Sequence, residues 1–294
     1  MSDDYIAFDW GSTHLRAWRF QQGQCIDSRK LEAGITRLAG RHPRDIFQTV
    51  TAGWQAQQVP VIMAGMVGSN AGWHSVPYLP CPLALSQLAR HLTRIEDLAW
   101  IVPGVSVDDK GGLNIMRGEE TQLLGAWQLA PSSLYIMPGT HCKWVQVEQG
   151  RLQSFKTVIA GELHHLLLNH SLIGTGLPSQ VTDRQAFMAG LERGLQDGDI
   201  LPLLFEVRAA YILGRLAQEA VSERLSGLLI GAEVAQMRRL YGSLSGQHVT
   251  IVGSPQLAAR YQSALALIGI TAEIVAGDTA FQQGIRCIAN ELAN

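Results

Sequence analysis

Three short segments of the sequence combine glycine with side chains that could bind and transfer a phosphate. The first, DWGST, places the carboxylate of Asp9 just before a turn rich in backbone amides and hydroxyls. Such a turn binds anions, and Mg²⁺ prefers carboxylate, water and phosphate oxygens as its ligands. We therefore expect Asp9 to hold a hydrated Mg²⁺, while Gly11, Ser12 and Thr13 surround the transferring phosphate. A hairpin turn with a capped aspartate is the alternative.

A second segment, PGTHCKW, repeats the order of glycine, threonine and a basic residue but lacks the acid. Its backbone amides and the Thr140 hydroxyl would also contact phosphates, and one carboxylate for two turns suits one metal ion. Gly139, His141 and Lys143 complete this predicted phosphate site. A histidine beside a turn more often satisfies backbone groups, and Lys143 can equally be a solvated strand residue.

The third segment, RGEE at 117–120, leads into a predicted helix, TQLLGAWQL. Phosphoryl transfer requires an aligned acceptor hydroxyl and a base that removes its proton late, and a carboxylate suffices for that base. Glu119 and Glu120 are both candidates, and the choice between them is open. Two acids at a helix start are also common as surface residues that stabilise the helix dipole.

Basic residues and a glycine-rich loop are candidates for binding an acidic substrate. Arg16 and Arg117 could bind a carboxylate or phosphates, although Arg16 could also be a solvated strand residue. Several glycines follow the apolar run VPVIMA and predict either close approach of the backbone to a substrate or a flexible surface turn. The loop residues that we expect to contact the substrate are Gly65, Met66, Gly68 and Ser69.

A strand-glycine-helix junction predicts a nucleotide site near the end of the chain. The run VTIV ends in Gly253, and Ser254 and Pro255 then form a typical helix start. A helix N-terminus at this place can bind phosphate or a nucleotide. Junctions of this kind are common in α/β proteins, so a merely well-capped helix is the alternative.

An internal repeat organises these segments. Thr13, Gly23 and Gly34 recur at a constant offset as Thr140, Gly150 and Gly161, with basic and Ala-Gly positions also matched. Each copy predicts an antiparallel meander of three strands that turns at QQGQ or EQGR. Two meanders followed by helix-rich sequence predict an α/β protein with two lobes and a central cleft.

The remaining pattern predicts a first domain at 1–130 and a second at 131–294, with the last helix packing back on the first lobe. In that helix, the small residues Ala280 and Gly284 could permit a close helix contact or could equally be ordinary packing residues. Helices are expected at 43–58, 84–98, 162–171, 183–195, 202–224 and 279–292. Strands are expected at 59–64, at 227–231 (GLLIG) and at HVTIVG and TAEIVA.

Composition limits the class of protein. Apolar residues make up 47% of the 294 residues and charged residues 16%, which favours a buried core over disorder. The net charge of −2 gives no basic surplus for nucleic acid. No signal-like N-terminus, long apolar run or CxxC pair is present, so we expect a cytoplasmic protein without membrane or zinc sites. A homodimer is left open.

Taken together, FDWGSTHLRAW, AGMVGSNAGW, RGEETQLLGA, MPGTHCKWV and AGELHHLL resemble the 2-dehydro-3-deoxygalactonokinase family from end to end. More widely, DWGST resembles phosphate-1, PGTHCKW phosphate-2 and IVGSPQLAARY the adenosine motif of the actin-like ATPase superfamily, which includes sugar kinases and heat-shock ATPases. The resemblance implies Mg²⁺-dependent transfer of the ATP γ-phosphate to the 6-hydroxyl of 2-dehydro-3-deoxy-D-galactonate. The products would be the 6-phosphate and ADP, in galactonate catabolism.

The resemblance also bears on the base. RGEE is similar to the Gly-x-Glu-Glu segment of exopolyphosphatases, in which a glutamate activates water, and this favours Glu119 or Glu120. Many relatives carry an aspartate near phosphate-2, where this chain has His141, Cys142 and Lys143, so an aspartate base cannot be assigned there. A phosphoanhydride hydrolase of the same fold and a nucleotide-gated sugar sensor are the alternative functions.

Overall fold

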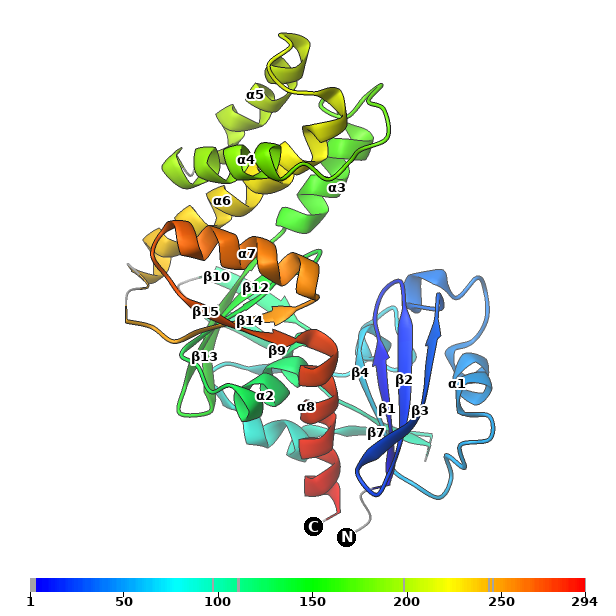
Figure 1. Ribbon diagram of the computed structural model, residues 1–294. Helices are drawn as coiled ribbons and strands as arrows, with labels where there is room; N and C mark the ends of the chain where they lie inside the picture. Colours follow the sequence, from blue (N-terminus) through cyan, green and yellow to red (C-terminus); the bar gives the residue numbers. More distant parts are fainter. Residues whose placement is uncertain are drawn as a thin grey trace. The chain divides into compact units, whose positions relative to one another are not determined.

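The computed structural model describes residues 4–96, 98–109, 112–197, 199–242, 244 and 246–293. Contacts within the chain define two compact units, and Figure 1 labels their elements. Unit 1 comprises Met1–Pro131, Val145–Phe155 and Val275–Asn294, and unit 2 comprises Ser132–Trp144 and Lys156–Ile274. The domain division after residue 130 stays a prediction.

The first sheet of unit 1 runs in the order β3 (Gln24–Leu31), β2 (Leu15–Gln21), β1 (Tyr5–Trp10), β4 (Val61–Gly65), β8 (Ala99–Ile101) and β7 (Thr93–Ile95). Strand β1 pairs antiparallel with β2 and parallel with β4. Because side chains alternate along a strand, Ile6, Phe8 and Trp10 share one face of β1. They are buried with Phe47 of helix α1 (Pro43–Thr51), which therefore covers that face.

A second six-stranded sheet runs in the order β15 (Ala272–Ala276), β14 (Val249–Gly253), β11 (Leu134–Met137), β12 (Cys142–Glu148), β13 (Arg151–Val158) and β6 (Leu83–Ala84). Both predicted meanders are confirmed, as β1-β2-β3 and β11-β12-β13. They turn at Gln22-Gly23, with φ of 50° and 72°, and at Gln149-Gly150, with φ of 49° and 74°. Two central residues with positive φ match the tight hairpin turns that follow the twist of the strands.

Unit 1 also contains a close helix pair, α2 (Glu119–Leu129) and α8 (Gly277–Leu292). A Cβ atom on Gly125 would lie 1.8 Å from the carbonyl oxygen of Ala280, and one on Gly284 would lie 2.0 Å from that of Thr121. The two backbones therefore touch, and the close contact expected at Ala280 and Gly284 is confirmed. A three-stranded sheet, β10 (Gly112–Met116), β9 (Gly104–Asp109) and β5 (Tyr78–Pro80), precedes α2.

Unit 2 is rich in helix, with α3 (Ala160–His170), α4 (Arg184–Asp197), α5 (Ile200–Ile212), α6 (Val221–Tyr241) and α7 (Pro255–Leu267). Helices α4 and α6 also meet through glycine. A Cβ on Gly190 or Gly227 would lie 2.2 or 2.0 Å from a carbonyl oxygen of the partner helix. None of the helices in the described part of the chain combines the length and apolarity required to cross a membrane.

Several predicted elements are wrong. The segment 227–231 lies inside α6, because a short apolar run does not distinguish a buried strand from a buried helix. The segment 84–98 forms the 3₁₀ helix η3 (Leu85–His91) followed by β7, and its buried Leu85 and Leu88 have the three-residue spacing of a 3₁₀ helix. The segment 202–224 is interrupted after α5, where Gly214 takes a φ of 67°.

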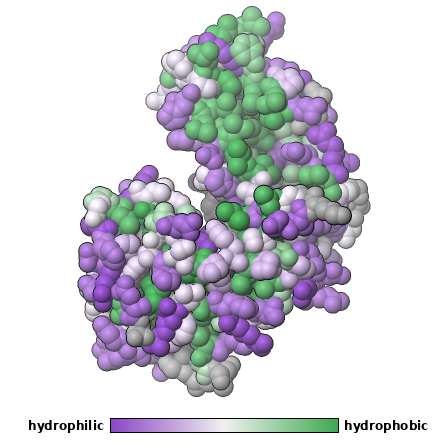
Figure 2. All heavy atoms as spheres, turned by 180° about the vertical axis from the view of Figure 1, so that it is seen from behind, coloured by the Kyte–Doolittle hydropathy of each residue, from purple (hydrophilic) through white to green (hydrophobic). Residues whose placement is uncertain are grey.

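Apolar side chains remain exposed on the helical part of unit 2. Leu201 and Phe205 of α5 are 79% and 66% exposed, and Ile212 and Leu213 follow at its end. Hydrophobic residues gather at the top of Figure 2, where this helical part lies. These helices therefore bury only part of their apolar surface within unit 2.

The α2–α8 contact generates a stability prediction. Replacing Gly125 with valine would force a branched side chain against the Ala280 carbonyl, and we expect a loss of about 3 kcal/mol in the free energy of unfolding. Asn290→Val, which adds the same side chain at an exposed position of α8, is the matched control. Urea unfolding of both variants measures the effect, and equal stability of the two would contradict the contact.

Candidate functional site

Three backbone segments of unit 1 meet through glycine. Trp10 ends β1, Gly65 ends β4 opposite Trp10, and Gly118 precedes α2. A Cβ on Gly65 would lie 2.8 Å from the Trp10 carbonyl oxygen, and one on Gly118 would lie 3.2 Å from the Gly65 Cα. Both glycines have positive φ, 98° and 109°. The DWGST turn, the loop that begins at Gly65 and the RGEE segment are therefore brought together.

Glycine also shapes both of the turns that are predicted to bind phosphate. A Cβ on Gly34 would lie 2.2 Å from the Ser12 carbonyl oxygen, and one on Gly161 would lie 2.3 Å from that of Gly139. In each copy of the repeat, the segment after the third strand thus packs directly on the turn. Sequence reasoning included these glycines in the repeat but assigned them no role in the site; their matched offset was the available signal.

Asp9 belongs to an ion-pair network in unit 1. The Arg16 guanidinium donates to the carboxylates of both Asp9 and Asp278. Arg16 is therefore paired and is not a solvated strand residue. Asp278, in the first turn of α8, was missed by sequence reasoning, which placed the start of this helix one residue later, at residue 279.

A hollow of about 310 Å³ lies at this network. Its lining residues are Asp9, Gly11, Thr13, His14, Arg16 and Lys30. Burial raises the pKa of the Asp9 carboxyl, the Arg16 guanidinium opposes this shift, and the charges of Asp278 and Glu119 reinforce it. Among the described residues, no group of three or more His, Cys, Asp or Glu side chains that could hold a metal ion occurs.

The two glutamates of RGEE lie in different environments. Glu120 is 0% exposed, and its carboxyl accepts the Gly118 N–H at 2.6 Å and bonds the Thr121 hydroxyl at 3.0 Å. Burial, reinforced by the Glu119 charge, raises the pKa of Glu120 to about 8. Glu119 is only partly buried and accepts the Arg117 N–H at 3.1 Å. Glu120 is thus a protonated internal group near neutral pH, whereas Glu119 is accessible.

The predicted substrate loop is held by hydrogen bonds between its own residues. Met66–Gly68 forms the 3₁₀ helix η2, and both the amide and the hydroxyl of Ser69 donate to the Met66 carbonyl oxygen, at 3.0 and 2.8 Å. Val67 and Gly68 are buried. The alternative of a flexible surface turn is therefore wrong for these residues.

In unit 2, Lys143 and Glu162 contact the second predicted phosphate turn. Lys143 is 3% exposed and donates to the His141 carbonyl oxygen at 3.3 Å, so it is not a solvated strand residue. The His141 Nε2 lies 2.7 Å from a carboxylate oxygen of Glu162, which is in the first turn of α3. Thr140 is exposed, and its carbonyl oxygen accepts the Glu162 N–H at 3.0 Å.

The strand-glycine-helix junction lies beside this turn. A Cβ on Gly253 would lie 3.5 Å from the Pro138 ring. Ser254 is the N-cap residue of α7, as predicted, but its hydroxyl makes no capping hydrogen bond. A hollow of about 120 Å³ adjoins the turn, and it is lined by Gly139, Ala160, Gly161, His164, Ser226, Leu229, Ile230, Leu257 and Tyr261.

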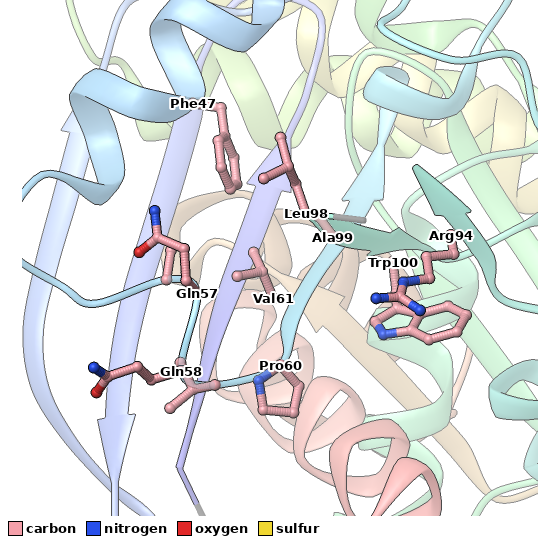
Figure 3. A pocket seen from close by; sticks show the side chains of 11 residues that line it. Phe47, Gln57, Gln58, Pro60, Val61, Arg94, Leu98, Ala99 and Trp100 are labelled. Atoms are coloured by element: carbon pink, nitrogen blue, oxygen red, sulfur yellow. The ribbon is translucent and has the colours of Figure 1, made fainter. Parts of the chain in front are cut away.

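Another hollow, of about 320 Å³, lies in unit 1 at the opposite end of β4, where Val61 begins the strand. Figure 3 shows its lining, in which the Arg94 guanidinium lies 5.6 Å from the centre of the Trp100 ring. It contains none of the predicted site residues. The candidate site is therefore at the end of β4 that carries Gly65.

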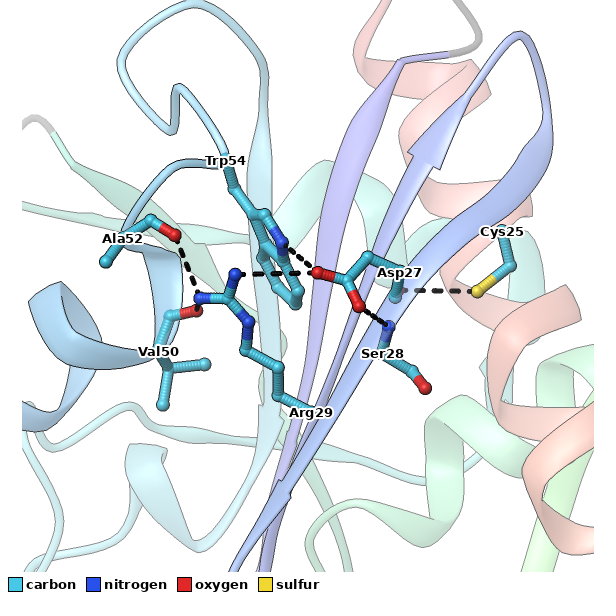
Figure 4. A network of polar contacts seen from close by, with 7 residues as sticks. All are labelled: Cys25, Asp27, Ser28, Arg29, Val50, Ala52 and Trp54. Atoms are coloured by element: carbon cyan, nitrogen blue, oxygen red, sulfur yellow. Dashed lines mark hydrogen bonds and ion pairs between the residues drawn. The ribbon is translucent and has the colours of Figure 1, made fainter.

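A polar network on β3 also lies apart from these residues. Asp27 accepts the Trp54 indole N–H at 2.8 Å, and Arg29 donates to the carbonyl oxygens of Val50 and Ala52 at 2.5 and 3.0 Å (Figure 4). Arg29 also stacks 4.2 Å from the Trp54 ring centre. The network fastens the end of α1 to the edge strand and is structural.

Comparisons with known proteins bear on the whole chain. A family model described as 2-keto-3-deoxy-galactonokinase matches residues 9–288. The 2-dehydro-3-deoxygalactonokinase of Escherichia coli (strain K12) is 56% identical over 295 residues, covering 100% of each chain. A solved Sinorhizobium meliloti structure, described as a 2-dehydro-3-deoxygalactonokinase protein, is 33% identical with a TM-score of 0.88, covering 98% of this chain and 99% of that one.

A more distant solved structure shares the fold alone. The activator of the 2-hydroxyisocaproyl-CoA dehydratase from Clostridium difficile, solved with bound ADPNP, is 12% identical, with a TM-score of 0.54. The match covers 99% of this chain and 95% of that chain. The likeness therefore extends over both units of the fold.

Glu120 generates a prediction on pH. Its pKa of about 8 in the folded chain exceeds the ordinary 4.5, so the folded state binds more protons than the unfolded state between these values and loses stability as pH rises through them. Glu120→Gln removes this loss. Relative to the unchanged protein, the variant should gain on the order of 3 kcal/mol between pH 5 and pH 9. Urea unfolding across this range measures it; parallel stability curves would contradict the assignment.

Proposed function

The chain belongs to the 2-keto-3-deoxy-galactonokinase family, and we propose on that premise that it transfers the γ-phosphate of ATP to the 6-hydroxyl of 2-dehydro-3-deoxy-D-galactonate. The products are the 6-phosphate and ADP. The observation that carries the proposal is 56% identity over the full length of the Escherichia coli protein of that name. The predicted α/β fold of the actin-like ATPases and sugar kinases is confirmed by the solved relatives.

We assign the phosphate contacts to the two turns of the repeat. Gly11, Ser12 and Thr13 would bind phosphate in unit 1, supported by the packing of Gly34 on their backbone. In unit 2, Gly139, Thr140 and His141 would do the same. Lys143 would place its positive charge next to this turn, because it is buried and donates to the His141 carbonyl oxygen. We place the nucleoside near Gly253 and Ser254, which adjoin this turn.

The donor set at Asp9 fits a hydrated Mg²⁺. The Asp9 carboxylate lines the hollow at the first phosphate turn, which leaves room for water and phosphate oxygens around one cation. When bound, Mg²⁺ would offset the negative charge of the phosphates. Arg16 would hold the Asp9 carboxylate in place and share its charge with Asp278.

We assign Glu119 as the base. As the sugar 6-oxygen bonds to the γ-phosphorus, the bond from that phosphorus to ADP breaks, and the hydroxyl proton passes to the Glu119 carboxylate. Glu120 is unsuited to this step, because it keeps its own proton near neutral pH and its oxygens are bonded internally. Its contact with the Gly118 N–H instead fixes the loop before α2.

The substrate assignment is tested by Mg-ATP-dependent phosphorylation of four acceptors with a control lacking sugar. The acceptors are 2-dehydro-3-deoxygalactonate, 2-dehydro-3-deoxygluconate, galactonate and galactose. We expect the first to be phosphorylated with the highest kcat/KM and ATP hydrolysis without sugar to be slow. Rapid hydrolysis without any phosphorylated sugar would instead indicate a phosphoanhydride hydrolase, and no turnover would favour a nucleotide-gated sensor.

The assignment of the base is tested by a matched pair of isosteric variants. Glu119→Gln should lower kcat about 100-fold or more, the usual contribution of a positioned base, with little change in the KM for ATP. Glu120→Gln should keep kcat within about tenfold, because a neutral amide replaces a carboxyl that is already protonated. Steady-state kinetics at pH 7 decides between them, and the reverse pattern would assign the base to Glu120.

A cytoplasmic location and a homodimer stay predictions. The first is supported by the 56% identical Escherichia coli relative, which is named as a kinase. The second would cover the apolar side chains exposed on α5.

A further inference from the structure

Arg117 is a buried cation whose hydrogen-bonding capacity is only partly used. The residue is 8% exposed, and its Nη2 donates to the Val76 carbonyl oxygen at 2.5 Å. Within the described part of the chain, Nε and Nη1 are buried and have no hydrogen-bond partner. A buried N–H group left unpaired destabilises the protein, because it has lost its hydrogen bonds to water. A ligand that pairs with this guanidinium would recover that cost.

The surroundings of Arg117 place this charge at the candidate site. The guanidinium lies 4.3 Å from the centre of the Tyr78 ring, a cation–π contact that compensates only part of the lost hydration. A Cβ on Gly68 would lie 2.8 Å from Nη1, so the loop after Gly65 has room for the guanidinium only because residue 68 is glycine. The backbone N–H of Arg117 meanwhile donates to Glu119, the assigned base.

We propose that Arg117 recognises the carboxylate of the sugar acid and so makes the enzyme selective for acidic over neutral sugars. This inference rests on the proposed function and deepens it. A carboxylate satisfies a guanidinium with both charge and acceptor oxygens. The two glycine turns already provide the proposed contacts for the phosphates of ATP. Arg117 instead contacts the proposed substrate loop, and its backbone N–H donates to the proposed base. We therefore assign the anion that pairs with its guanidinium to the acceptor substrate.

The arrangement also defines how the carboxylate reaches Arg117. In this structure the segment Gly68–Val76 covers the guanidinium, and the Val76 carbonyl takes one of its donors. The incoming carboxylate would displace this segment and replace a neutral acceptor with a charged one. Substrate binding would thereby be coupled to the loop that begins at Gly65.

The test compares the sugar acid with its neutral C1 amide in the unchanged enzyme and in Arg117→Met. We expect the variant to lose about 100-fold in kcat/KM for the acid, as for other desolvated charge pairs, and to keep its kcat/KM for the amide within about threefold. Arg37→Met, at an exposed arginine of unit 1, is the control and should change neither value. Equal losses on acid and amide in Arg117→Met would overturn the proposal and make Arg117 structural.

A second variant keeps the proposal testable if Arg117→Met unfolds. Arg117→Lys keeps the positive charge but loses the planar fork, and we expect about a tenfold loss on the acid with the preference for acid over amide retained. A loss of preference in this variant, with the melting temperature unchanged, would contradict recognition by charge. If the unchanged enzyme phosphorylates neither compound, the proposed function fails first, and this outcome is distinct from a failure at Arg117.

Discussion

The candidate site depends on the contact of three backbones, at Trp10, Gly65 and Gly118. No side chain can stand between them, because a Cβ on either glycine would meet the neighbouring main chain. The contact places the end of β1, the end of β4 and the start of α2 at one point of unit 1. Asp9, Arg117 and Glu119 each lie within two residues of this contact, so the glycines fix where these candidate residues lie.

Helix α8 connects this contact of three backbones to the charged residues of the candidate site. Its Gly284 holds it against α2, whose first turn carries the two glutamates, and its Asp278 reaches Arg16 on β2. Arg16 in turn pairs with Asp9. Helix α8 therefore contacts both the helix that carries Glu119, the proposed base, and the arginine that pairs with Asp9. Burial then differentiates the acids, because Glu120 loses contact with solvent and holds a proton, while Glu119 remains accessible.

Local sequence patterns predicted the meanders, their turns and the segments of the site. The signals for these features, alternating side chains in strands and the residue types that favour positive φ in turns, lie in neighbouring residues. Local sequence patterns failed where packing between distant segments decides the structure. GLLIG became part of α6 because its two glycines allow α4 to approach, which no window of sequence records. Glu119 and Glu120 are identical residues in one turn, and only their three-dimensional surroundings separate them. Asp278 joined the site through α8, far along the chain from Arg16.

The two copies of the repeat have similar backbone packing but different side-chain contacts. Gly34 and Gly161 pack on the turns in the same way, so the amides of both turns are shaped alike. The basic residues at the matched positions of the repeat make different contacts. Arg16 pairs with the two carboxylates beside a hollow, whereas Lys143 is buried and donates to the backbone of its own turn. Only the first turn also carries an acid. The duplicated backbone therefore suits the two anion sites that we propose, and the single carboxylate is the reason for proposing the cation at the first of them.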